Sequence, residues 1–166
     1  MGANYLVQLA AEWYEFQGYF VLRNVKVAGT GKAGGGELDV LAQHPTSGEF
    51  VHVEASMDSD SWEKRDKRFR AKFRVGQAHV EAIARGFRKK PVLRQRALLG
   101  YARAARRRTL GGGELVLIPG LLHEIIDALS ARRLDRRIVP EHLPLLRTLQ
   151  FVSEYRDDLF ARDQLF

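Results

Sequence analysis

The stretch ELDVLAQHPTSGEFVHVEAS, residues 37–56, has the pattern of two short strands joined by a turn. Polar and apolar side chains alternate along ELDVLA, residues 37–42, and again along FVHVEAS, residues 50–56. The link over residues 44–49 contains Pro, Ser and Gly, which favour turns. An antiparallel hairpin is therefore predicted, with its apolar faces turned to a core.

The polar faces of this hairpin carry two acids. Alternation places Leu38 and Val40 on one face, with Asp39 on the other, and it places Glu54 on the polar face with His52. Two carboxylates a few Å apart repel unless one is protonated or a cation lies between them. Such oxygen ligands suit Mg²⁺ or Mn²⁺, which bind phosphates and activate water. The alternative is an ordinary amphipathic hairpin whose acids face water.

Helices and strands flank the hairpin in a regular order. Apolar residues at helical spacing predict a helix over residues 5–17, and a β-rich run predicts a strand over residues 19–27. A glycine-rich loop over residues 29–36 leads into the hairpin. A long basic helix is predicted from about residue 62 to residue 86, with Ser61 as its N-cap.

The C-terminal part continues the alternation of strands and helices. A strand is predicted over residues 97–102, although the flanking Arg-Ala runs could also be helical. A clearer strand is predicted over residues 114–118, stopped by the Pro and Gly that follow it. Amphipathic helices are then expected over residues 121–133 and 145–152. The order predicts an α/β fold with a mixed sheet flanked by helices and with extra C-terminal helices.

Composition limits the remaining possibilities. A length of 166 residues and a 45% hydrophobic content predict one domain over residues 1–166, with a core over about 5–119 and a helical part over about 120–166. The chain has no cysteine, which excludes disulfides and thiolate metal sites and makes the cytoplasm the expected location. Neither an apolar run of about 18 residues nor a signal peptide is visible, so no membrane partner is expected.

The distribution of charge points to a polyanionic partner. Residues 62–108 contain 17 Lys or Arg and three Asp or Glu, a net charge of +14, whereas the rest of the chain carries −7. The total is +7. A basic segment inside an otherwise acidic chain favours nucleic acid as the partner, although a solvated basic helix is the alternative.

Residues 5–86 resemble the PD-(D/E)XK nuclease superfamily, which has the restriction-endonuclease-like αβββαβ core. The resemblance rests on a helix ending in Gly-Tyr-Phe at residues 18–20, a strand, a glycine loop, the GELDVLA segment at residues 36–42, a turn and FVHVEAS. Small members such as Holliday-junction resolvases show this layout. The motifs are short, and their order in the chain carries the comparison.

The resemblance implies a metal site. Asp39 corresponds to the metal-binding aspartate and Glu54 to the glutamate of the Glu-x-Lys element, with Mg²⁺ or Mn²⁺ as the cofactor. The family lysine two residues after this glutamate is replaced by Ser56. Lysines of the following helix could supply the missing basic group, and we favour Lys72 over Lys64 and Lys67. Alternatively, all three lysines face DNA or solvent.

Four other residues raise narrower questions. Relatives often carry a functional glutamate on the first helix, for which Glu12 or Glu15 could substitute, although exposure of both is the simpler expectation. His52 could bind a phosphate or a water, or serve the structure alone. Gln77 is similar to a helix glutamine of exonuclease-like relatives. The histidine spacing predicts no zinc site.

These observations lead to a functional hypothesis and its alternatives. The hypothesis is a metal-dependent endonuclease that hydrolyses phosphodiester bonds of DNA, with Asp39, Glu54, Ser56 and Lys72 as its catalytic positions. DNA is favoured over RNA as the partner, although the sequence does not decide between them. The residues predicted to bind nucleic acid are Lys64, Arg65, Lys67, Arg68 and Lys72. One alternative is a catalytically impaired relative that binds nucleic acid without cutting. Another is a basic partner within a defence or repair assembly, and the sequence also allows a homodimer.

Overall fold

A computed structural model of the chain describes residues 5–29, 35–88, 90–102, 106–130 and 138–161. Most of the predicted glycine loop, residues 30–34, and the last five residues lie outside this part of the chain. The chain divides into two compact units, Met1–Ile118 and Pro119–Phe166. Each unit is described by itself.

The first unit contains a six-stranded sheet and two main helices. Its elements are α1 (Tyr5–Phe16), β1 (Phe20–Val27), β2 (Gly36–Gln43), β3 (Phe50–Ser56), α2 (Trp62–Ile83), the 3₁₀ turn η2 (Ala84–Gly86), β4 (Leu93–Leu99), β5 (Thr109–Leu110) and β6 (Gly113–Leu117). The strand order is β1-β2-β3-β4-β6-β5. β1, β2 and β3 pair antiparallel, β3, β4 and β6 pair parallel, and β5 pairs antiparallel with β6. The predicted mixed α/β sheet is thus confirmed.

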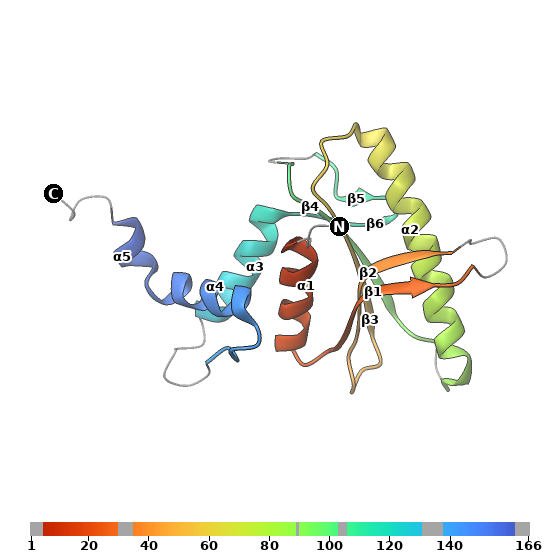
Figure 1. Ribbon diagram of the computed structural model, residues 1–166, viewed down its shortest axis with the longest axis horizontal. Coiled ribbons are helices and arrows are strands. Elements are labelled where there is room, and N and C mark those ends of the chain that lie inside the picture. Colours follow the sequence, from red (N-terminus) through yellow and green to blue (C-terminus); the bar gives the residue numbers. More distant parts are fainter. Residues whose placement is uncertain (1–4, 30–34, 89, 103–105, 131–137, 162–166) are drawn as a thin grey trace. The chain divides into compact units, whose positions relative to one another are not determined.

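α1 and α2 cover opposite faces of the sheet (Figure 1). Neighbouring residues of β4 show the alternation: Arg96 donates a hydrogen bond of 2.9 Å to the hydroxyl of Tyr14 on α1, whereas Ala97 packs with Phe69 and Phe73 of α2. The two phenylalanines lie four residues apart and therefore share one face of the helix. They anchor α2 by burial of apolar surface, as the sequence predicted.

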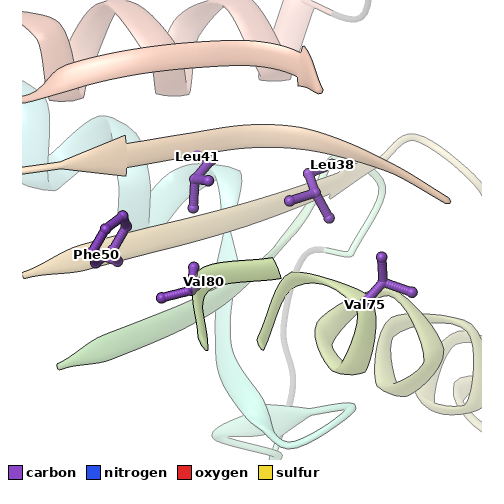
Figure 2. Close-up of a cluster of buried hydrophobic side chains, with 5 residues drawn as sticks. All are labelled: Leu38, Leu41, Phe50, Val75 and Val80. Carbon is purple, nitrogen blue, oxygen red and sulfur yellow. The ribbon is translucent and has the colours of Figure 1, made fainter. Parts of the chain in front are cut away.

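A second apolar cluster fixes the other end of α2 (Figure 2). Figure 2 shows Leu38 and Leu41 of β2, Phe50 of β3, and Val75 and Val80 of α2 gathered in one group. All five side chains are buried. With about 1.5 to 3 kcal/mol for each fully buried side chain of this size, the cluster holds β2 and β3 against the helix.

Local signals explain most boundaries of the elements. Ser61 caps α2, because its hydroxyl accepts a hydrogen bond of 3.4 Å from the backbone N–H of Lys64. The predicted hairpin is confirmed as β2 and β3. The β5–β6 hairpin was not predicted. It turns at Gly111 and Gly112, whose φ angles of +61° and +92° suit a two-residue turn of glycines.

The second unit is helical. Its helices are α3 (Ile118–Ser130), α4 (Pro144–Glu154) and α5 (Arg156–Phe160). The start of α3 was predicted wrongly. The Pro and Gly at positions 119 and 120 follow β6, but they also lie in the first turn of α3, where the missing N–H of a proline breaks no helical hydrogen bond. In the first unit, the strand predicted over residues 97–102 was also misplaced, because β4 begins and ends earlier, at Leu93 and Leu99. Among the described helices, none combines the length and the hydrophobicity that a membrane span requires.

Candidate active site

The hydrogen-bonded ladder of the hairpin stops at the two predicted acids. Pairing between β2 and β3 runs from Gln43 and Phe50 to Val40 and Val53. The next pair in this register would be Asp39 and Glu54, but these two residues do not pair in the ladder between β2 and β3. The strands therefore separate where the carboxylates lie.

The neighbouring strand is irregular at the same level. Asn24 of β1 falls opposite Asp39 in the register, and it is the single described non-glycine residue with positive φ, at 51°. Asparagine tolerates this left-handed conformation better than most residues. Leu38 and Leu41 lie in one cluster, although strict alternation would separate them. The predicted alternation along residues 37–42 thus breaks at Asp39.

Side chains replace the ladder at this point. The backbone N–H of Asp39 donates to Oε1 of Glu54 at 3.3 Å, and the backbone N–H of Ala55 donates to Oδ2 of Asp39 at 2.8 Å. Each acid therefore binds the backbone of the opposite strand through one oxygen. Its second oxygen, Oδ1 of Asp39 or Oε2 of Glu54, stays available to other partners.

Lys72 of α2 contacts both of these remaining oxygens. Its Nζ forms an ion pair with Oε2 of Glu54 and lies 3.5 Å from Oδ1 of Asp39. The Lys72 side chain is 36% exposed, whereas Glu54 is fully buried. Three elements, β2, β3 and α2, thus bring two carboxylates and one amine to a common point that borders solvent.

The three groups respond differently to this environment. Burial and the nearby charge of Glu54 raise the pKa of Asp39 to about 6. Burial by itself would also raise the pKa of Glu54, but a hydrogen bond from His52 and the charge of Lys72 hold it below its ordinary value. Burial opposes the charged form of Lys72, yet Glu54 and Asp39 raise its pKa. Perturbed groups that share one place are typical of functional sites.

His52 lies beneath the acids and does not reach the surface. It is fully buried, and its Nε2 lies 2.7 Å from Oε1 of Glu54. Its ring packs edge-on against Phe73, with 5.4 Å between the ring centroids. Direct binding of a phosphate or of bulk water by His52, one of the two roles considered from the sequence, is therefore excluded.

Ser56 belongs to a separate polar network. Its hydroxyl donates to Asp58, and it also accepts a hydrogen bond of 3.3 Å from Arg68. Asp58 is bound in addition by Arg65 and Arg68. Although burial opposes it, the hydrogen bonds from Ser56 and Arg65 hold the pKa of Asp58 well below its ordinary range. This network closes the loop between β3 and α2.

The predicted nucleic-acid-binding residues separate into two groups. Lys64 and Lys67 are exposed along the outer side of α2. Arg65 is buried, with its Nε 2.9 Å from Oδ1 of Asp58, so we assign it to the loop contact and not to a binding surface. Arg68 is 37% exposed but is held by Asp58 and by Asp60, the latter at 2.9 Å.

The remaining candidates have other surroundings. The expectation that Glu12 is exposed was wrong: it is buried on α1 and accepts a hydrogen bond of 2.9 Å from Gln8. Glu15 is partly exposed and lies 3.7 Å from Arg23. Gln77 lines a pocket of about 270 Å³. The other residues of this pocket are Val80, Glu81, Lys90, Pro91, Leu93 and Gln95, so it is separate from the two acids.

The donor set fits a hard divalent cation of the magnesium type. Among the described residues, no group of three or more His, Asp or Glu side chains is arranged to hold a metal. Mg²⁺ does not need such a group, because proteins bind it through one or two carboxylates together with water and substrate phosphate. Asp39 and Glu54 each have one oxygen that the backbone does not bind, and in this structure Lys72 pairs with both of these oxygens. Zinc would require more protein ligands.

Comparison with known proteins adds no family to this description. No protein-family model matches the chain, and no curated protein shows significant similarity to it.

Proposed function

We propose that this chain is a metal-dependent endonuclease of the PD-(D/E)XK type that hydrolyses phosphodiester bonds in DNA. Asp39 and Glu54 are its metal ligands, Mg²⁺ or Mn²⁺ is its cofactor, and Lys72 is its basic residue. The bound metal would polarise the scissile phosphate and lower the pKa of the attacking water.

The arrangement of the first unit supports this assignment. The elements α1, β1, β2, β3, α2 and β4 follow one another in the order of the αβββαβ core, with β1 to β4 adjacent in the sheet. Asp39 and Glu54 lie on neighbouring central strands. Fold alone does not establish function, so the proposal depends on the site.

The observation that carries the proposal is the position of Lys72. The family places its lysine on the same strand as the glutamate, where this chain has Ser56. Lys72 instead reaches both acids from α2, 18 residues after Glu54. Its ammonium can orient a water against the phosphate and stabilise the negative charge that develops there. The amine is thus present although the motif position lacks it.

The other residues of the site have defined tasks in this proposal. Asp39 and Glu54 each hold one oxygen fixed through the opposite backbone and offer the second one to the cation. Lys64 and Lys67, exposed on α2, contact phosphates of the DNA without reading its bases. Arg107, which lies over the ring of Trp62 at 5.6 Å, extends the same basic segment.

Cleavage assays test the proposal directly. Purified protein is incubated with duplex, branched and single-stranded DNA in Mg²⁺, in Mn²⁺ or in EDTA. We expect cutting of at least one substrate that requires the metal and is lost in Asp39→Asn and in Glu54→Gln. Glu81→Gln, which removes an exposed charge at the far end of α2, should cut normally. Metal-dependent cutting that survives in both site variants would refute the assignment.

A second candidate function rests on the ion pair itself. Lys72 forms ion pairs with both acids, which would also suit a protein that binds nucleic acid and no longer cuts it. Salt-sensitive DNA binding without cleavage in either metal would favour this reading, including a role in a defence or repair assembly. A cytoplasmic location and a homodimer are compatible with both candidates.

A further inference from the structure

We infer that His52 is a positioning residue, which fixes Glu54 so that only Oε2 of this carboxylate can bind the metal. The inference rests on the proposed function and extends it to a residue outside the two acids and the lysine. It starts from the hydrogen bond of 2.7 Å between Nε2 of His52 and Oε1 of Glu54, in which both side chains are fully buried.

Polar contacts hold the ring of His52 on two sides. A carboxylate only accepts, so Nε2 must carry the proton that it shares with Glu54. On the other side, the amide Nε2 of Gln95 lies 3.4 Å from Nδ1 of His52. This amide also donates to the backbone carbonyl of Phe73 at 2.8 Å, which fixes its nitrogen in that place. The geometry therefore makes Nε2–H the group that donates to Glu54, while the Gln95 amide holds the opposite edge of the ring.

The same bond decides how Glu54 meets a cation. Oε1 receives two donors, Nε2 of His52 and the backbone N–H of Asp39. Oε2 faces Lys72 at the border with solvent. The carboxylate can thus neither rotate nor bind a metal through both oxygens without breaking protein hydrogen bonds. Outer partners of this kind orient ligating groups and tune metal affinity.

α2 is shaped to admit the ring. Gly76 lies in the interior of this 22-residue helix, where glycine is unfavourable. A Cβ at this position would lie 2.2 Å from Nδ1 and 2.4 Å from Cε1 of His52. Any larger residue would therefore require the imidazole or the helix to shift. The glycine is thus evidence, separate from the hydrogen bonds, that α2 leaves room for the His52 ring at this position.

Two substitutions separate the hydrogen bond from the bulk of the ring. His52→Leu fills the site but has no donor, whereas the amide nitrogen of His52→Gln can reach the place of Nε2. Calorimetric titration of the full chain with Mn²⁺ should show an affinity about 10- to 100-fold lower in His52→Leu, and within about threefold of the wild type in His52→Gln. Val80→Ala serves as the control, because it weakens the neighbouring apolar cluster without touching Glu54.

The outcomes distinguish this inference from the proposed function. If the wild type binds Mn²⁺, Glu54→Gln does not and His52→Leu binds as the wild type does, the role of His52 is refuted and the nuclease proposal stands. If the wild type binds no Mn²⁺ without DNA, the inference about His52 is overturned, whereas the nuclease proposal is decided by the cleavage assays. Loss of affinity in Val80→Ala equal to that in His52→Leu would also refute the inference, because reduced stability would then explain it. Long-range ¹H–¹⁵N spectra need no metal, and an Nε2 that carries no proton in the wild type would contradict the inferred hydrogen bond to Glu54.

Discussion

Lys72 on α2 and Glu54 on β3 form an ion pair at the border between the interior of the sheet and solvent. The carboxylate is fully buried and its partner is about one-third exposed. Removal of one member of such a pair leaves the other charge uncompensated, which is costly when that charge is buried. The pair therefore combines a structural role with the catalytic role proposed for Lys72, and the first experiment has to separate them.

Replacement of Lys72 tests the catalytic role. We expect Lys72→Ala to lower the cleavage rate about 10²- to 10⁴-fold, the range for loss of a positioned acid–base group. Lys67→Ala, an exposed lysine of the same helix, should raise the DNA concentration needed for half-maximal cutting but preserve the maximal rate. Cleavage rates measured over a series of DNA concentrations up to saturation give both quantities. A Lys72→Ala rate within a fewfold of the wild type would assign the lysine to the structure alone.

A lysine introduced at position 56 completes the test of the catalytic role of Lys72. Ser56 occupies the position where related nucleases carry their lysine, so Ser56→Lys should restore part of the cleavage lost in Lys72→Ala. In the wild-type background we expect little gain, because Lys72 already supplies the amine. A large gain there would instead indicate that the native site lacks its base.

The order of elements could be predicted because each one has a local signal. Alternation gave the hairpin, Ser61 gave the start of α2, and apolar spacing gave the helices. The β5–β6 hairpin was missed because two residues are too short for a periodic pattern. The start of α3 was misplaced because proline and glycine end a strand and also tolerate the first turn of a helix.

The site could be predicted only in part, because distant segments complete it. The sequence paired Asp39 with Glu54 through strand alternation, but several lysines of α2 were equivalent until packing selected Lys72. Burial of Glu12 was not expected, since a helical pattern does not reveal what covers a polar position. Gly76 was a usable signal: a glycine inside a long helix indicates a close neighbour, although not which one.

Gly76 gives the second prediction. Alanine normally stabilises a helix interior by about 1 kcal/mol relative to glycine. Here the added Cβ would overlap the ring of His52, so Gly76→Ala should instead destabilise the fold by about 1 to 3 kcal/mol. Gly120→Ala of α3, which meets no atom within 4 Å, is the matched control and should be neutral or stabilising. Urea denaturation measures both. A more stable Gly76→Ala protein would show that the ring can move aside freely.

The third prediction concerns pH and the raised pKa of Asp39. Its pKa is about 6 in the folded protein and about 4 when unfolded, so the folded state binds more protons between these values. Stability should therefore fall as pH rises through this window, because ionisation of the buried acid is unfavourable. Asp39→Asn cannot ionise, so its stability relative to the wild type should increase by roughly 2 kcal/mol between pH 4 and pH 7. Urea denaturation in EDTA measures this difference, and a constant difference across the window would contradict the raised pKa.

The burial of Arg65 and the exposure of Lys67 predict different effects of salt on DNA binding. Each phosphate contact on duplex DNA contributes about 0.9 to the slope of log affinity against log salt. Lys67→Ala should therefore reduce the magnitude of this slope by about one unit, because its ammonium faces solvent on the outer side of α2. Arg65→Ala should lower stability without changing the slope, since its guanidinium already binds Asp58. Lys26→Ala, an exposed lysine on β1, controls for net charge and should leave the slope unchanged. Equal slopes for the wild type and Lys67→Ala would remove this face of α2 from the proposed DNA contact, whatever the outcome at the two acids.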